Sequence, residues 1–256
     1  MAHYQVILAY DGTEFLGFQR QVKNKQSLTI QGVFETALIE IGWHGRSVAA
    51  AGRTDTGVHA SGQVLAFDLD WDHPERDLLA ALNAHLPPDM AVQNVRIVES
   101  NFHPRFDACA RRYRYQIFCQ PVRDPLRERF FWRVWPPPDL KCLSDAASHL
   151  EGVHDFCAFG SPPSLGGSTI REVFQAGWRE NRDELIFEIC GNAFLYRMVR
   201  RLVRLQVTVG QGKLEVDSIR LSLLNCDKGL VRGLAPAKGL NLVEVIYSDP
   251  VITQTA

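Results

Sequence analysis

Segments with strand and helix periodicity follow one another along this chain without strict alternation, and this order limits the folds it can adopt. Residues 5–10 are strand-like, and Asp11-Gly12 ends that strand with turn-forming residues. Apolar residues then recur every three or four positions from Ile30 to Ile41, which predicts a helix with Thr29 as its N-cap. Together these segments predict an α+β fold with mixed, largely antiparallel sheets.

The pattern recurs loosely in the second part of the chain. The further expected strands cover residues 48–52, 63–67, 90–98, 112–119, 170–178, 184–190 and 242–246. The further expected helices begin near Pro74, Leu140, Phe194 and Asp217. We therefore expect two similar α/β halves, residues 1–105 and residues 106–256.

Bulk properties are those of a folded protein outside the membrane. Hydrophobic residues make up 46% and charged residues 22% of the chain. No apolar run approaches the roughly 18 residues that span a bilayer, and the start of the chain does not resemble a signal peptide. The six cysteines are widely spread without a C-x-x-C pair. We therefore expect reduced thiols, no zinc site, no membrane contact and a cytoplasmic location.

Arginine is distributed unevenly along the chain. The net charge of −1 alone would argue against a nucleic acid partner, but 22 of the 28 basic residues are arginine. Eight of them lie between Arg105 and Arg133, against three acids, and a second cluster occupies residues 197–204. Because guanidinium groups pair with phosphates and stack on bases, these clusters favour nucleic acid recognition over a limited face.

One carboxylate stands out in a turn bracketed by glycines. Asp55 lies between Gly52 and Gly57, two residues after Arg53, with the apolar run 48–51 before it and a strand-like run after it. A buried strand that ends in a tight polar turn can hold a reactive side chain rigidly. From the turn alone, an ordinary hairpin with a turn-favouring aspartate is an equal alternative.

Seven short blocks occur in order along nearly the whole chain. They are Asp11-Gly12-Thr13 with Phe15, Gly17, Phe18 and Gln19; Gly52-Arg53-Thr54-Asp55 with Gly57-Val58-His59-Ala60; Leu82-Asn83-Ala84 to Leu86-Pro87; Phe102-His103-Pro104-Arg105-Phe106; Arg112-Tyr113-Arg114-Tyr115; Phe194-Leu195-Tyr196-Arg197-Met198-Val199-Arg200; and Ala235-Pro236-Ala237-Lys238-Gly239-Leu240. In these blocks the chain resembles the tRNA pseudouridine synthases of the TruA type.

The resemblance implies an activity and a set of partners. It implies an isomerase that converts uridine to pseudouridine on the 3′ side of the tRNA anticodon arm, expected at tRNA positions 38, 39 and 40. It also implies the pseudouridine synthase fold, in which two α/β halves form a central RNA-binding cleft. The working form is implied to be a homodimer, with tRNA as the partner and no metal, nucleotide or redox cofactor.

The resemblance also implies roles for individual residues. By motif position, Asp55 is the nucleophile, and Arg200 is the arginine that keeps its carboxylate ionised. Arg53 is expected to contact the RNA, and Tyr113 to face the extruded base. A further group is expected to bind the tRNA phosphates: Arg105, Arg112 and Arg114. His59 and His103 are expected to form structural hydrogen bonds.

Two other function classes fit parts of the sequence. A haloacid dehalogenase-type phosphatase is suggested by Tyr10-Asp11-Gly12-Thr13, but its nucleophilic aspartate would occupy position 9, which is Ala9. A non-catalytic RNA-binding module would explain the arginine clusters. Such a module has no need of a carboxylate in an RNA-facing cleft, where it would repel phosphate.

Overall fold

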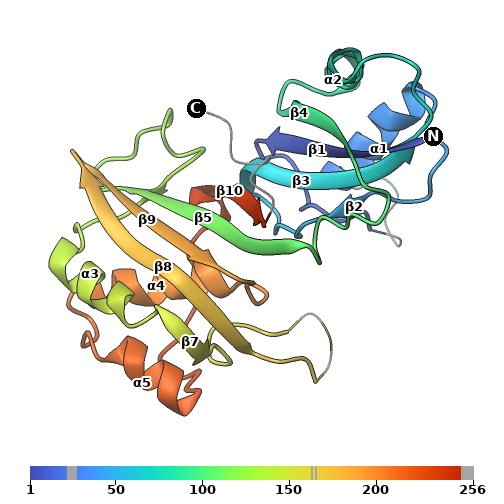
Figure 1. Cartoon of the computed structure of the whole chain (residues 1–256). Coiled ribbons are helices and arrows are strands. Elements are labelled where there is room, and N and C mark those ends of the chain that lie inside the picture. The colour runs from blue at the N-terminus through green and yellow to red at the C-terminus, as the bar shows by residue number, and fades with distance from the viewer. Residues whose placement is uncertain (22–27, 163, 165, 249–256) are drawn as a thin grey trace. The chain divides into compact units, whose positions relative to one another are not determined.

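The computed structural model describes residues 1–21, 28–162, 164 and 166–248, which form two compact units (Figure 1). The first unit comprises Met1–Cys109 and the chain from Leu242, and the second comprises Ala110–Asn241. The final strand, which sequence reasoning assigned to the second half, therefore belongs to the first unit. The elements are helices and mostly antiparallel strands, which confirms the predicted α+β class.

The first unit is a sheet with two helices. Its elements are β1 (Ala2–Tyr10), α1 (Ile30–Glu40), β2 (Ala49–Ala50), β3 (His59–Leu69), α2 (Glu75–His85), β4 (Met90–Val98) and most of β10 (Leu240–Tyr247). The strand order is β4-β1-β3-β10, and the short β2 pairs with β3. In β1, alternate residues from Tyr4 to Tyr10 are buried, as expected for a strand with one covered face.

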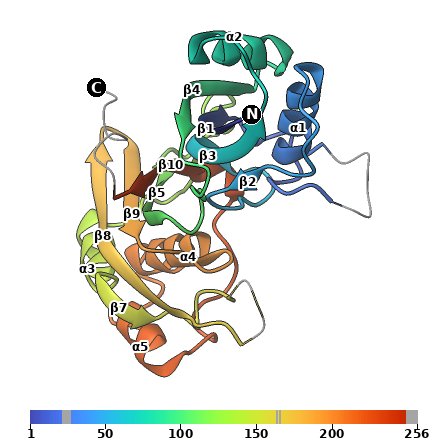
Figure 2. The ribbon, with the colours of Figure 1, turned by 45° about the vertical axis from the view of Figure 1, so that its right-hand side comes forward.

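Helix α1 begins where its sequence predicts. The Thr29 side chain accepts a hydrogen bond from the Gly32 amide at 3.2 Å, which satisfies an amide that the helix leaves unpaired. The buried Phe34 ring packs edge-on against Phe67 of β3, with ring centroids 5.9 Å apart. The helix therefore covers the apolar face of the first sheet and contacts α2 beside it (Figure 2).

The second unit is a sheet covered by helices on one face. Its elements are β5 (Ala108–Phe118), β6 (Trp132–Arg133), α3 (Leu140–Ser148), β7 (Gly152–Asp155), β8 (Ile170–Asn181), β9 (Glu184–Gly191), α4 (Met198–Gly210), α5 (Ser218–Asn225) and the 3₁₀ turn η1 (Ala237–Gly239). The strand order is β5-β9-β8-β7. The Trp178 indole of β8 donates to Gln206 of α4 at 2.8 Å inside the core, which fixes α4 on this sheet.

The predicted start of the long helix is wrong. Sequence periodicity placed Phe194 and Leu195 inside it, but α4 begins at Met198. Arg197 adopts the left-handed conformation, with φ of 62°, and this stops the helix from extending toward Phe194. The apolar spacing continues through the interruption because Leu195 is buried by a turn rather than by a helix. None of the helices in the described part of the chain is long and apolar enough to cross a membrane.

A guanidinium braces the long connection after β5. Arg127 pairs with Asp183 at 2.6 Å and Glu184 at 3.0 Å, and its guanidinium carbon lies 4.5 Å from the centroid of the Phe118 ring. The hydrogen bond from Arg127 is the main reason that the pKa of Asp183 lies below its usual range. Residues 119–131 are thereby tied to the β8–β9 turn.

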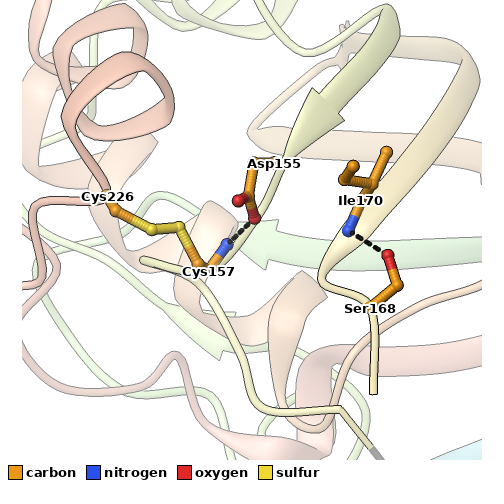
Figure 3. The surroundings of a disulfide bond; sticks show 5 residues. All are labelled: Asp155, Cys157, Ser168, Ile170 and Cys226. Atoms are coloured by element: carbon orange, nitrogen blue, oxygen red, sulfur yellow. Dashed lines mark hydrogen bonds between the residues drawn. A yellow bond between two sulfur atoms is a disulfide. The ribbon is translucent and has the colours of Figure 1, made fainter. Parts of the chain in front are cut away.

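A disulfide links two segments of the second unit. Cys157, just after β7, is bonded to Cys226 at the end of α5, with Cα atoms 5.5 Å apart (Figure 3). The expectation of reduced thiols is therefore wrong for this pair. Asp155 accepts a hydrogen bond from the Cys157 amide at 3.0 Å (Figure 3). The two cysteines are 69 residues apart, so only the tertiary fold brings them together.

Removing this disulfide should weaken the fold. Because the bond closes a long loop, reduction should lower the free energy of unfolding by about 2–4 kcal/mol. Denaturant unfolding with and without reductant measures the difference. Cys157→Ser should abolish the effect of reductant, whereas Cys142→Ser, which alters a free thiol, should leave it. Protein purified without reductant and then unfolded should show four reactive thiols; six would contradict the bond.

The Arg127–Asp183 pair should make stability depend on pH in the acid range. The folded-state pKa of Asp183 is lowered, so the stabilisation is present above the unfolded-state pKa of about 3.9. It is lost as pH falls from about 4 through the folded pKa. Asp183→Asn should lower the free energy of unfolding by about 1 kcal/mol at pH 7 and by little at pH 2, as measured by urea unfolding. The exposed Asp72→Asn is the matched control, and an equal loss at both pH values in Asp183→Asn would refute the linkage.

Candidate active site

Asp55 lies in a loop of the first unit between β2 and β3, which we call the Asp55 loop (residues 52–58). The Val58 amide donates to the Asp55 carbonyl at 3.1 Å and closes a tight turn. Gly57 occupies the third position of that turn with φ of 74°, a conformation that favours glycine. Asp55 is half-buried, and Arg53 in the same loop is exposed.

Thr54 anchors the loop beside Asp55. Its hydroxyl hydrogen-bonds the Tyr10 hydroxyl at 2.7 Å in a buried contact, and its carbonyl accepts from the Phe18 amide at 3.0 Å. The residue before Asp55 is therefore held by both its side chain and its backbone. Such fixation lowers the freedom of Asp55 and can hold its carboxylate in a set direction.

Two glycines let the segment after β1 lie directly against the Asp55 loop. A Cβ atom at Gly17 would lie 3.1 Å from the Thr54 carbonyl oxygen and 3.2 Å from the Thr56 amide nitrogen. Gly17 also has φ of 90°. A Cβ atom at Gly12 would collide with the Val58 carbonyl. Larger residues at either position would push the Asp55 loop away, which gives a physical reason for these glycines.

Two buried polar side chains complete the bracing. Gln63 of β3 is fully buried, and its amide nitrogen donates to the Gly52 carbonyl at 2.9 Å. The Nδ1 atom of buried His59 lies 3.1 Å from the Gly12 amide nitrogen and 3.0 Å from an Asp11 carboxylate oxygen. His59, the first residue of β3, thus ties the strand that follows the Asp55 loop to the segment after β1, as expected of a structural histidine.

Sequence reasoning missed these bracing residues. Local sequence patterns indicate no role for Tyr10, Thr54 or Gln63, although the polar Gln63 directly precedes the apolar run Val64–Phe67. A polar residue at the edge of a buried strand needs a partner, so Gln63 carried a usable signal. The tyrosine–threonine pair spans 44 residues and had no local signal.

Tyr113 lies on β5 in the second unit. It pairs with Ile189 of β9, and its ring contacts Phe194 edge-on with centroids 5.1 Å apart. Because side chains alternate along a strand, Tyr113 is on the same face of the sheet as Tyr115. Tyr115 is fully buried, and its burial raises its pKa well above the usual value for tyrosine. Tyr113 itself is only half-buried.

The two arginines that flank Tyr113 are on the opposite face of β5. Both the Nε and Nη2 atoms of Arg114 lie 2.8 Å from Glu188 of β9. Arg112 donates to the side chain of Gln175 on β8 at 3.3 Å. The structure therefore separates Arg112 and Arg114 from the Tyr113 ring, although the three are adjacent in sequence.

Arg200 lies in the first turn of α4, also in the second unit. Its Nε atom donates to the Ala235 carbonyl at 2.8 Å, and the Ala235 amide donates to the Arg200 carbonyl at 3.1 Å. These two bonds fix the stem of the guanidinium against the buried Ala235. Asp55 and Arg200 belong to different units, so their pairing stays a prediction.

The remaining candidate residue is in the first unit. Arg105 is exposed in the loop after β4, and its amide donates to Nδ1 of His103 at 3.1 Å. The structure thus brings Asp55 and Arg53 together in one loop and places Arg105 in a second loop of the same unit.

One group of potential metal ligands exists among the described residues. Asp155, Cys157 and Cys226 have ligand atoms within 4.8 Å of one another. Both sulfur atoms take part in the disulfide, so neither is a thiolate that can bind a metal. This group lies in the second unit, whereas Asp55 lies in the first.

Comparisons with known proteins show that this chain is similar to a group of RNA-modifying enzymes. A sequence model of a family described as tRNA pseudouridine synthase matches residues 6–107 and 146–248. The chain is 37% identical to tRNA pseudouridine synthase A of Limosilactobacillus fermentum, covering 99% of each chain. It is 39% identical to the Brevibacillus brevis protein of the same name, covering 96% of this chain and all of the relative. It is 38% identical to that of Latilactobacillus sakei subsp. sakei, covering 95% and 98%.

Gly17→Ala should displace the Asp55 loop. Gly17 and Gly42 have nearly the same positive φ, 90° and 92°, but a Cβ atom at Gly42 would meet nothing within 4 Å. Gly42→Ala therefore measures the backbone strain alone, about 1–2 kcal/mol. Gly17→Ala should destabilise the fold more and speed hydrogen exchange at the Phe18 and Val58 amides. Equal stability and unchanged exchange in the two variants would show that the close approach does not hold the loop.

Proposed function

The chain belongs to the tRNA pseudouridine synthase family, and from that premise we propose that Asp55 is the nucleophile with which it converts uridine in tRNA to pseudouridine. The family match and the near full-length relatives support an isomerase that acts on tRNA. The observation that carries the choice of Asp55 is the bracing of its loop through Thr54, which fixes a half-buried carboxylate in the loop before β3.

The chemistry explains why a single carboxylate suffices. Pseudouridine is an isomer of uridine: the bond between ribose C1′ and uracil N1 breaks, and a bond between C1′ and C5 forms. The C5 proton is lost, N1 gains a proton, and the carboxylate leaves at the end, so atoms and electrons balance without an external reactant. Because only a nucleophile and proton transfers are required, the reaction proceeds without a redox cofactor or a nucleotide.

The carboxylate must be ionised to attack. A carboxylate that a bound RNA shields from water needs an opposing charge to stay ionised, so we expect such a charge near Asp55. Arg200 is our candidate for that charge, because its hydrogen bonds with Ala235 hold the guanidinium stem in place. A guanidinium with a fixed stem loses less conformational entropy when it pairs with a carboxylate.

The other candidate residues have RNA-directed roles in this proposal. A uridine inside an RNA helix must be extruded, at a cost of roughly a few kcal/mol. The exposed Arg53, next to the nucleophile, contacts the RNA, and Tyr113 stacks on the extruded uracil. Arg105, Arg112 and Arg114 bind phosphates. Arg114 must break its pair with Glu188 to bind a phosphate group. Its contribution to tRNA binding is therefore smaller than that of an arginine with no carboxylate partner.

The assembly and location also belong to the proposal. We expect a homodimer that binds tRNA, with the uridines of the 3′ side of the anticodon arm as substrates. We expect the protein in the cytoplasm, where tRNA is modified. A disulfide is uncommon in that compartment. The number of reactive thiols shows whether Cys157 and Cys226 are bonded, so that measurement also tests the expected location.

Asp55→Asn is the test of the proposed nucleophile. The amide keeps the shape of the side chain but cannot attack as an anion, so pseudouridine formation in a tRNA transcript should fall by on the order of a thousandfold or more. The dissociation constant for tRNA should stay within about threefold, because the backbone bonds of the loop are unaffected.

Asp70→Asn, which alters an exposed carboxylate of the same unit, is the matched control and should keep full activity. Normal product formation by Asp55→Asn would rule out the nucleophile assignment. Product lost only in proportion to tRNA binding would favour the alternative of a non-catalytic RNA-binding module.

A further inference from the structure

The loop after β4 exposes an aromatic ring at its tip. We call residues 102–107 the Phe106 loop. The Phe106 side chain is 76% exposed, although a phenylalanine ring normally contributes a large apolar area to a core. Leaving the ring in water forgoes the stabilisation that burying it would give, so this position is costly for the isolated chain.

The Phe106 loop is held rigid by its own hydrogen bonds. The His103 amide donates to the Asp107 carboxylate at 2.7 Å, and the Asp107 amide donates to the His103 carbonyl at 3.1 Å. Nδ1 of His103 accepts from the amides of Arg105 and Phe106 at 3.1 and 3.4 Å. The ring of Phe106 is therefore presented by a closed turn, and its exposure does not come from a loose segment.

The base of the loop is fixed to the core of the first unit. Pro104 is buried, and its carbonyl accepts from the Tyr247 hydroxyl of β10 at 2.8 Å. The Phe102 ring packs on Tyr247 with centroids 5.2 Å apart, and the Phe102 carbonyl lies 3.0 Å from Nε2 of His3. A ring carried by a loop that is fixed in this way loses little conformational entropy when a ligand stacks on it.

The chemistry around the ring suits a nucleotide. The His103 ring lies beside Phe106, with centroids 4.3 Å apart and planes tilted by 35°. The guanidinium carbon of Arg105 lies 5.8 Å from the centroid of the Phe106 ring. A flat π surface next to a cation is the combination that proteins use to stack an unpaired base and meet its phosphate.

We infer that Phe106 is a stacking platform for an unpaired base of the tRNA, with Arg105 on the adjoining phosphate. This inference rests on the proposed function, because it takes tRNA as the ligand. It adds a site in the first unit that is separate from the Asp55 loop in sequence and that contributes to binding through a neutral ring.

Variants of Phe106 test the stacking. Phe106→Ala and Phe106→Leu should raise the dissociation constant for a tRNA transcript roughly five- to hundredfold, since neither side chain offers an aromatic ring on which a base can stack. Phe106→Trp should restore binding to within about threefold. Phe174→Ala, which removes a half-exposed ring of β8, is the control for loss of a surface ring and should bind normally.

Salt dependence separates the ring from its arginine. Removing one arginine–phosphate pair reduces the slope of log K against log salt by about one, so Arg105→Ala should flatten the slope. Phe106→Ala should weaken binding with the slope unchanged, because the ring carries no charge. A flattened slope in Phe106→Ala would show that the loop acts through charge and would overturn the platform.

Three other outcomes would also overturn the inference. They are wild-type tRNA affinity in Phe106→Ala, wild-type affinity in Phe106→Leu, and a lower oligomer mass of Phe106→Ala by sedimentation, which would make the ring a contact between copies of the chain. Thermal unfolding of each variant shows whether it still folds. If Phe106→Ala or Phe106→Leu does not fold, the tRNA affinity of Phe106→Trp decides the test. If the Phe106 variants overturn this inference while Asp55→Asn is inactive, the proposed function stays intact.

Discussion

The candidate site depends on the close approach of two backbone segments, the one after β1 and the Asp55 loop. Phe18 donates its amide to the Thr54 carbonyl, and the carbonyls of Gly17 and Phe18 accept from Ile30 and Gln31 at the start of α1. The same two residues therefore connect the first helix to the loop that carries Asp55. Because a Cβ at position 17 would press on that loop, glycine there is what lets the helix, the strand and the loop meet.

Strand geometry explains why neighbouring residues in one sequence block lie on opposite faces of the sheet. In β5, Tyr113 faces the helix-covered side with Tyr115, while Arg112 and Arg114 face the other side and contact Gln175 and Glu188. An arginine that already has a carboxylate partner gains less from a phosphate, since one pair must break for the other to form. Counting arginines therefore overstates how much positive charge this strand offers to RNA.

Local sequence signals predicted much of the fold. The N-cap at Thr29, the end of α2 before Pro87 and the strand Met90–Val98 all follow from side-chain chemistry within a few residues. The start of α4 and the disulfide do not follow from such local side-chain chemistry. A non-glycine residue in the left-handed conformation, such as Arg197, is invisible to apolar periodicity, and cysteines 69 residues apart pair only through the tertiary fold.

The candidate site shows the same division between local and distant information. Sequence placed Asp55 in a glycine-flanked turn, and the structure shows that turn closed by the Asp55–Val58 hydrogen bond. The contacts that make it rigid come from Tyr10 and Gln63, which lie on strands and read as ordinary strand residues. A carboxylate braced in this way cannot relax toward solvent when it is desolvated by a substrate. In the proposed mechanism the reactivity of Asp55 is then set by the charge placed opposite it, so its partner matters more to that chemistry than the turn that carries it.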